Sequence, residues 1–328
     1  MNSLSIYGLK ALRKVYAKIF RVSSLSLPKC NQDAKQVSEL IYSELTGDKA
    51  CMIARFGSTE LSMLVNHLGV KKADKSLPRF VQGKTQPWWY EENRMQQMQN
   101  WSGFFPPTEE KIQQFCELML EDIKEVDVLG SWVANEQYVV DQIKAQLVHL
   151  RLLEPFYVSQ PWTRALKGKK VLVVHPFTET IAHQYKNREK LFVNPDVLPE
   201  FASLGLVKAV QSLGQGSDRF ADWFDALQWM KDEIDKQDYD VCLIGCGAYG
   251  FPLAAHVKRQ GKKAVHIGGS LQLLFGIKGK RWEDPNYGVE AWGIPQGFYP
   301  AMMNKHWVRP GQTETPKTAG QVEGACYW

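Results

Sequence analysis

The stretch Val241-Cys-Leu-Ile-Gly-Cys-Gly-Ala-Tyr-Gly250 is the strongest indicator of the fold of this chain. An apolar run ends in a Gly-x-Gly-x-x-Gly pattern, and a helix-forming segment and a second apolar run, 263–267, follow it. This order is typical of a strand, a glycine turn, a helix and a parallel strand, in which the turn approaches a phosphate-bearing ligand. Amides at the helix N-terminus then point at the negative charge of that ligand. The alternative is that the glycines only allow tight packing of helix on strand.

Segments of strand length alternate with segments of helical period on both sides of this unit. This alternation predicts an α/β fold with a mostly parallel sheet and helices on both faces. The predicted strands are 50–56, 126–129, 169–175, 207–210, 239–244 and 263–267. The predicted helices are 33–46, one opening at 57–60, 108–124, 135–148, one ending near 190, 218–236 and 250–260, with Ser58 or Thr59, Thr108 and Asp218 as N-caps.

The chain is expected to divide into a basic amphipathic helix, 1–28, and a single α/β domain, 29–328. Residues 75–107 hold several Pro, Gly and Trp and predict a loop-rich insertion with one short helix near 90–100. Residues 278–328, rich in Gly, Pro, Trp and Tyr, predict an irregular C-terminal wrap.

Composition narrows the class of protein. With 44% hydrophobic and 23% charged residues, the chain has the make-up of a globular protein, and no apolar run approaches the ~20 residues that span a bilayer. No signal-peptide pattern follows the N-terminus, so we expect a cytoplasmic protein. The six cysteines are scattered without zinc or redox spacing, which favours small buried residues in a reducing compartment.

Positive charge is concentrated at the N-terminus. Residues 1–30 hold six Lys or Arg and no acid, which leaves 34 basic and 35 acidic side chains in the rest of the chain. The remainder is therefore near neutral, and nucleic-acid binding is not expected. At helical spacing, Leu4, Leu9, Leu12, Val15, Tyr16, Ile19 and Phe20 share one arc of residues 4–22, and Lys10, Arg13, Lys14, Lys18 and Arg21 share the other. Such a helix lies on an anionic membrane, here the inner membrane face, or packs on its own domain or a second subunit.

Polar or glycine-rich sequence follows five of the predicted strands. These strand ends are 55–60, 130–132, 175–179, 245–249 and 266–269. Because ligands of doubly wound sheets bind outside the carboxyl ends of the strands, the five ends predict a shared site. In the first of these strand ends, the guanidinium of Arg55 can bind a diphosphate, and Gly57 allows the backbone to approach the ligand closely. Glu60 can bind a divalent metal or a sugar hydroxyl. An Arg55–Glu60 ion pair is the alternative.

Other candidates come from the same ends and from nearby segments. His175 and His266 end apolar strands, and Glu179 lies in the loop after His175, so these are candidate acid or base groups, or merely structural and solvated ones. Four tryptophans can stack on sugar rings or pack in the protein: Trp88, Trp89, Trp101 and Trp132. Two basic residues near glycines, Lys280 and Arg281, can close over phosphates.

At these residues the chain resembles the GT-D-type glycosyltransferases, bacterial enzymes of surface glycan assembly. In that family a strand ends in Arg-Phe-Gly and runs into an Asp-x-Glu pair at the nucleotide-sugar site. Here Arg55-Phe56-Gly57 is followed by Ser58-Thr59-Glu60, so Glu60 matches the second acid and Ser58 replaces the first. The later unit, 243–268, has a comparable strand, glycine turn, helix and strand.

The resemblance implies a Rossmann-like fold and transfer of a sugar from a nucleotide-sugar donor, typically UDP-linked, to a glycan or lipid-linked glycan acceptor. The residues then implied are Glu60, His175 and Glu179 for catalysis, Arg55, Gly57, Ser58, Gly245, Gly247, Tyr249, His266, Lys280 and Arg281 for the donor, and Trp88, Trp89 and Trp132 for the acceptor. Serine is a poor ligand for Mg²⁺ or Mn²⁺, which puts the metal expected on Glu60 in doubt.

Two other functions fit the sequence. An oxidoreductase or methyltransferase would use the glycine turn for NAD or S-adenosylmethionine, although the acid expected about 20 residues after such a turn is missing. A non-catalytic scaffold would keep the fold and recruit partners of glycan assembly.

Overall fold

The computed structural model describes residues 3–23, 25–72, 75–212, 216–316, 319–321 and 325–328. Its α-helices are α1 (Ser3–Ile19), α2 (Ala34–Thr46), α3 (Ser58–Lys71), α4 (Leu77–Val81), α5 (Glu92–Ser102), α6 (Glu109–Asp122), α7 (Thr178–Lys186), α8 (Trp223–Asp235), α9 (Gly250–Arg259), α10 (Leu271–Leu274), α11 (Lys280–Glu283), α12 (Val289–Trp292) and α13 (Phe298–Met302). Its strands are β1 (Cys51–Ala54), β2 (Val128–Ser131), β3 (Gln146–His149), β4 (Lys170–His175), β5 (Ser203–Lys208), β6 (Val241–Ile244) and β7 (Lys263–His266).

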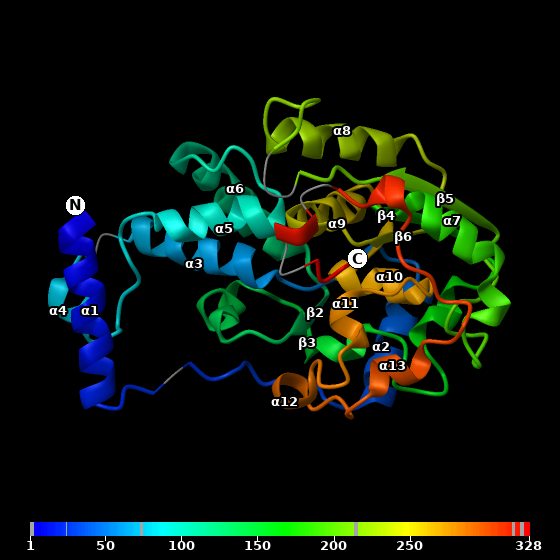
Figure 1. Ribbon diagram of the computed structural model, residues 1–328, viewed down its shortest axis with the longest axis horizontal. Coiled ribbons are helices and arrows are strands. Elements are labelled where there is room, and N and C mark those ends of the chain that lie inside the picture. The colour runs from blue at the N-terminus through cyan, green and yellow to red at the C-terminus, as the bar shows by residue number, and fades with distance from the viewer. Residues whose placement is uncertain (1–2, 24, 73–74, 213–215, 317–318, 322–324) are drawn as a thin grey trace.

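The strands form one seven-stranded sheet in the order β3-β2-β1-β7-β6-β4-β5, and every pair is parallel. The predicted α/β, Rossmann-like fold with a parallel sheet is therefore confirmed. The predicted helix α9 joins β6 to β7, its two flanking strands, which are neighbours in the sheet. Figure 1 shows helices on both sides of the sheet.

Alternate residues of the buried strands feed two cores, one on each face of the sheet. In β1, Cys51 and Ile53 join one core, and Met52 and Ala54 join the other, and all four are fully buried. The core that receives Met52 packs against α3, α6, α8 and α9, and the core that receives Ile53 packs against α2 and the C-terminal segment. Burial on both faces explains why these strands read as continuous apolar runs.

The helix predicted over 135–148 is wrong. Residues 134–142 form short 3-10 turns, and Gln146–His149 is the edge strand β3, paired with β2. The buried side chain of Glu136 accepts hydrogen bonds from the Trp132 and Val133 amides, which fixes a tight turn after β2 where a helix was expected. Val148, the β-branched residue of β3, is fully buried, and the pairing of Val128–Ser131 with Gln146–His149 defines the strand.

Two predicted N-caps also shift. Helix α3 is capped by Gly57 and not by Ser58 or Thr59, because the Glu60 carboxylate folds back into the space that a side chain at position 57 would fill. Helix α8 begins at Trp223 and not near 218; its N-cap is Asp222, whose Oδ1 accepts from the Phe224 and Asp225 amides. Thr108 caps α6 as predicted.

Helix α1 stands at one end of the molecule, beside α4 and away from the sheet (Figure 1). Two cations of its basic arc hold it there: Lys10 pairs with Glu91 at 2.5 Å, and Arg13 donates to the Thr85 carbonyl at 3.0 Å. Five of the seven residues of the apolar arc are exposed instead, with Leu4 84% and Ile19 66% exposed, and Leu9 and Tyr16 are half-buried. The amphipathic helix is thus present, but most of its apolar arc does not pack against the protein.

The C-terminal segment wraps back over the sheet as predicted, in short helices and turns. Glu314, fully buried, accepts hydrogen bonds from the amides of Glu179 and Thr180 at the start of α7. Among the described residues, no helix has the length and apolarity needed to cross a bilayer.

Candidate active site

A pocket of about 190 Å³ opens over the carboxyl ends of the four central strands β1, β7, β6 and β4. After β1 the chain continues to β2, its neighbour on one side within the sheet, and β7 is the neighbour of β1 on the other side. β4 and β6 are also neighbours; the chain runs from β4 outward to β5, but from β6 in the opposite direction to β7. These are topological switch points, where the diverging loops leave a crevice for a ligand. The pocket therefore lies where a doubly wound sheet binds ligands.

Arg55 follows β1 directly and is only partly exposed in this pocket. Its guanidinium lies 4.9 Å from the centre of the Trp132 ring, and Trp132 is held by a 3.0 Å hydrogen bond from its Nε1 to the Phe56 carbonyl. Burial lowers the pKa of Arg55, partly opposed by Glu60. Among the described residues, none forms a hydrogen bond or ion pair with this guanidinium. A cation that is desolvated, stacked and without a directly bonded anion is well prepared to bind one.

The glycine turn after β6 forms the adjoining wall. A Cβ at Gly245 would lie 2.6 Å from the Gly268 carbonyl oxygen and 2.9 Å from the His175 ring, so only glycine fits there. Gly247 has φ of +54°, which other residues rarely adopt. Gly250 begins α9, and the His266 ring occupies the space its side chain would fill. The glycines thus serve close packing between adjacent strand ends and also expose backbone to the pocket.

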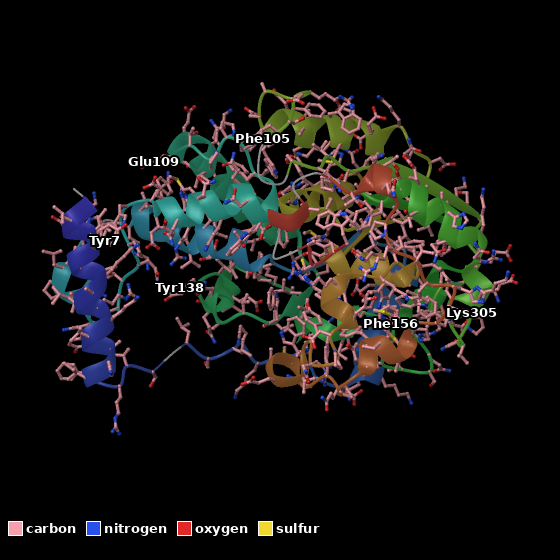
Figure 2. The ribbon with its side chains drawn as sticks, viewed as in Figure 1. Tyr7, Phe105, Glu109, Tyr138, Phe156 and Lys305 are labelled. Atoms are coloured by element: carbon pink, nitrogen blue, oxygen red, sulfur yellow. The ribbon has the colours of Figure 1, made fainter. Side chains whose placement is uncertain are left out.

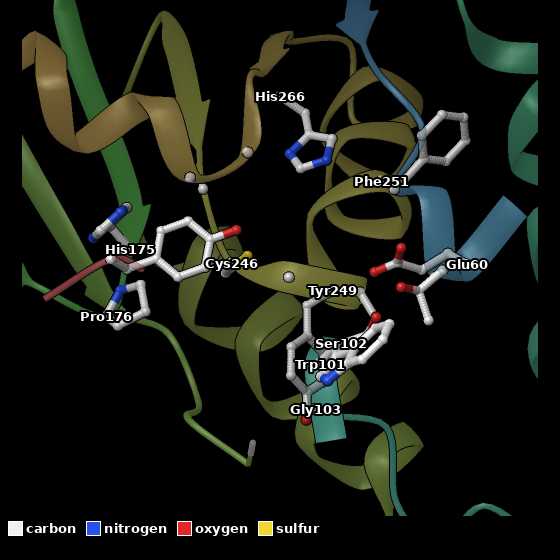
Figure 3. A pocket seen from close by; sticks show the side chains of 18 of the residues that line it. Glu60, Trp101, Ser102, Gly103, His175, Pro176, Cys246, Tyr249, Phe251 and His266 are labelled. Carbon is white, nitrogen blue, oxygen red and sulfur yellow. The ribbon is translucent and has the colours of Figure 1, made fainter. Parts of the chain in front are cut away.

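His175 and His266 line the pocket from two different strands (Figure 3). Nδ1 of His175 accepts from the Phe177 amide at 3.0 Å, so in the neutral ring Nε2 carries the proton. Nδ1 of His266 lies 3.2 Å from the Ile244 carbonyl and donates to it, so its Nε2 is the acceptor. Burial lowers the pKa of each ring to about 3. At neutral pH the pair therefore offers one uncharged donor and one uncharged acceptor, and His175 is a weak base.

These two histidines should make the fold sensitive to acid. An unfolded histidine titrates near pH 6.5, so between pH 6.5 and 3 the unfolded chain binds protons that the folded chain does not. Stability is therefore expected to fall as the pH falls, by about 2 kcal/mol per histidine between pH 7 and pH 5. Urea unfolding at the two pH values measures this change. His266→Gln should remove about half of what His175 and His266 together contribute, and His183→Gln, at an exposed position outside the pocket, is the control for the substitution itself. An undiminished pH slope in His266→Gln would contradict the assignment.

Glu60 lies in the first turn of α3, nine-tenths buried, and faces the same pocket (Figure 3). It is the one carboxylate that lines the pocket among the described residues, and none of these residues form a group of three His, Cys, Asp or Glu able to hold a metal. Ser58 supplies only a neutral hydroxyl beside it. This donor set does not fit a metal site built by the protein, and positive charge here comes from Arg55 and Arg281.

The pocket brings together most of the predicted site residues. They are Arg55, Gly57, Ser58, Glu60, Trp132, His175, Gly245, Gly247, Tyr249, His266 and Arg281. The side chain of Tyr249 is directed into the core, stacked on Trp223 at 5.0 Å and 3.0 Å from the Ser212 hydroxyl, so mainly its backbone is offered to a ligand.

Four predicted site residues lie outside the pocket. Glu179 is exposed and pairs with Lys208 at 3.3 Å, and Lys280 is also exposed. Trp88 and Trp89 pack against Phe80 in the insertion beside α1, with ring centroids 5.6 and 5.3 Å from it. Their packing role explains the aromatic composition of that segment.

The pocket also contains residues that sequence patterns did not single out. Gln272 is 1% exposed; its Nε2 donates to the carbonyls of Lys278 and Tyr327, and its buried Oε1 has no partner among the described residues. This oxygen can accept a hydrogen bond from a ligand. A glutamine inside the apolar run Leu271-Gln-Leu-Leu274 was the available signal. Tyr327 and Trp328 reach the same pocket from the C-terminal wrap.

Comparison with known proteins leaves the family open. No family model matches the chain, and the comparisons with curated proteins and with solved structures found no match. The resemblance to GT-D glycosyltransferases stays a prediction that rests on the residues of the pocket.

Proposed function

We propose that the protein is a glycosyltransferase that takes a sugar from a nucleotide-sugar donor, UDP-linked by analogy with GT-D enzymes. The observation that carries the proposal is Arg55: a desolvated cation that no described residue pairs with directly, stacked on Trp132, at the switch point of a parallel sheet. A diphosphate fits this position because the guanidinium fork binds two phosphate oxygens. The glycine turn after β6 offers close backbone approach beside it.

Transfer requires a bond between the acceptor hydroxyl oxygen and the anomeric carbon to form while the bond from that carbon to the phosphate oxygen breaks. Arg55 and Arg281 stabilise the negative charge that grows on the departing diphosphate. Glu60 accepts the proton that the acceptor hydroxyl loses, because it is the carboxylate inside the pocket. His175, through Nε2–H, and Gln272, through Oε1, orient hydroxyl and amide groups of the donor.

The acceptor in this proposal is a cell-surface polysaccharide or lipid-linked glycan precursor, met at the inner face of the membrane. The outward apolar arc of α1 supports it, because Lys14 and Lys18 are exposed on the same helix and Arg21 is exposed in the turn that follows it. Anionic lipid headgroups match these cations, and the acyl boundary matches Leu12 and Ile19. The cytoplasmic location is part of the same proposal.

A screen of nucleotide ligands tests the function. UDP and UDP-sugars at 100 times their Kd should stabilise the protein by about 2.7 kcal/mol and raise its melting temperature by a few degrees. NAD(P)H and S-adenosylmethionine should leave it unchanged. Release of UDP from the donor, measured with and without an acceptor glycan, separates an enzyme from a scaffold that only binds.

A metal arm belongs to the same screen. Because the described residues of the pocket offer one carboxylate and two arginines, Arg55 and Arg281, in place of a metal cage, UDP binding should survive EDTA with little change in Kd. Full recovery only with Mn²⁺ or Mg²⁺ would mean that Glu60 and Ser58 hold a metal with the diphosphate. A response to NAD(P)H or S-adenosylmethionine alone, or to no nucleotide, would refute the proposed function.

A further inference from the structure

A second cavity, of about 90 Å³, adjoins the first on the side of β2 and β3. The two cavities share one wall, made of Arg55, Trp132, Gly269, Arg281 and Tyr327. If the diphosphate of a ligand lies on Arg55, the group that is bonded to this diphosphate can therefore extend into the second cavity. Resting on the function proposed above, we propose that the second cavity binds a pyranose ring and that Glu154 positions it.

The walls of the cavity are aromatic. Trp132 meets Trp292 edge to face at 5.9 Å, Trp292 meets Tyr287 at 5.3 Å, and Trp282 meets Tyr287 and Tyr327. These ring contacts hold the aromatic walls in place, and the guanidiniums of Arg55 and Arg281 lie over the rings of Trp132 and Tyr327. Aromatic walls of this kind suit the C–H surfaces of a sugar.

Polar groups lie at fixed places among these rings. Glu154 lines the cavity, and its Oε2 accepts from the Tyr299 hydroxyl at 2.8 Å and lies 3.5 Å from the Tyr157 hydroxyl. Burial raises the pKa of this carboxyl to about 7, so near neutral pH it both donates to and accepts from hydroxyl groups. Aromatic walls with a small number of oriented polar groups distinguish a sugar site from a purely apolar one.

The wall formed by α12 is anchored from the other side of the cavity. Arg151, which follows β3, donates from Nη1 to the carbonyls of Trp292 at 2.9 Å and Gly293 at 3.0 Å. The C-terminal wrap is thereby tied to the sheet edge at the residue that faces Trp132. This explains why β3, which sequence patterns missed, matters for the site: it ends next to the segment that carries Glu154.

The test compares ligands with and without the sugar. Glu154→Gln keeps the shape of the side chain and its acceptor oxygen, and Trp292→Ala removes one wall. If the donor sugar occupies the cavity, both variants should raise the Kd for a UDP-hexose about tenfold or more and leave the Kd for UDP unchanged. If the acceptor sugar occupies it, both Kd values should stay and the KM for the acceptor should rise by the same factor.

The matched control is Glu290→Gln, an exposed glutamate on the same short helix as Trp292. It should change none of these constants, and thermal unfolding of all three variants should confirm that they fold. If UDP binding depends on Arg55 but the variants alter neither sugar-dependent constant, the sugar subsite is wrong while the glycosyltransferase proposal stands. If no nucleotide binds the wild-type protein, the proposed function fails and the subsite falls with it.

Discussion

Arg55→Ala is expected to weaken UDP binding and donor turnover by about 100-fold or more while leaving the protein at least as stable as the wild type. The loss follows from removing a preorganised cation from a desolvated pocket, a change that typically costs 10²–10³ in rate. The stability follows from burial of a cation that Glu60 offsets only in part: a buried charge without a hydrogen-bonded partner among the described residues opposes folding. Calorimetric titration with UDP and urea unfolding measure the two effects on the same sample.

Two further variants make this result specific. Arg55→Lys keeps the charge and loses the planar fork and the stack on Trp132, so it should recover only part of the binding. Arg188→Ala removes an arginine that pairs with Glu189 and Glu200 away from both cavities, and it should bind UDP normally. Normal UDP binding by Arg55→Ala would remove the observation on which the proposed function rests.

A loss of stability in Arg55→Ala would be equally informative. It would mean that the arginine supports the fold through Trp132 and is not held ready for a ligand. We therefore expect Arg55→Ala to weaken UDP binding without lowering the free energy of unfolding, as is found where a functional site destabilises the folded state. A scaffold without a ligand would give no such separation.

The parallel sheet was predictable because its central strands are buried on both faces. Continuous apolar runs such as 169–175 and 239–244 leave little choice of structure, and glycine at 245 and 247 marks the turn between strand and helix. The site followed from the same logic, since polar residues after parallel strands meet at one edge of the sheet. That reasoning predicts Arg55, Glu60 and His266 at one edge of the sheet, and all three line one pocket.

What could not be predicted depends on contacts between distant segments. The edge strand β3 is half exposed and short, so its pattern does not differ from that of a helix, and only pairing with β2 defines it. The second cavity forms only because the C-terminal wrap returns over β2 and β3, which no local pattern predicts. The sequence around Glu154 contains no motif that marks it as a site residue. The position of Glu179 after a strand predicts a catalytic acid or base. In the structure the buried carboxylate of Glu314, from the C-terminal wrap, accepts a hydrogen bond from the Glu179 amide, and the Glu179 carboxylate lies at the surface.

The second large effect is expected at α1. Replacing Leu12 and Ile19 together by Glu should abolish binding to vesicles that contain anionic lipid, because it removes two exposed apolar side chains and adds two negative charges. Each fully buried apolar side chain contributes about 1.5–3 kcal/mol, and each charge near the surface about 1 kcal/mol. The loss should therefore exceed 100-fold in the partition constant. Vesicle co-sedimentation measures it.

The folded body should not be affected, because neither residue provides the packing of α1. The helix is held by Lys10 on Glu91 and by Arg13 on Thr85 and Phe80, all on the face that these changes leave alone. UDP binding in solution should stay at the wild-type value in the Leu12→Glu, Ile19→Glu double variant. A second copy of the chain is the other partner that such a face could take, and sedimentation at increasing concentration would detect it.

Charge at α1 separates a membrane from a second copy of the chain. Lys18→Glu should weaken vesicle binding by about tenfold or more at low salt, and the effect should shrink as salt screens the surface. Lys305→Glu carries the same change at the opposite end of the molecule (Figure 2) and should have no effect. Equal losses in both variants would show that only net charge matters, and unchanged binding of both, with a concentration-dependent dimer, would assign the apolar face of α1 to self-association. A loss confined to Lys18→Glu would instead assign the amphipathic helix to an anionic membrane surface, as the proposed lipid-linked acceptor requires.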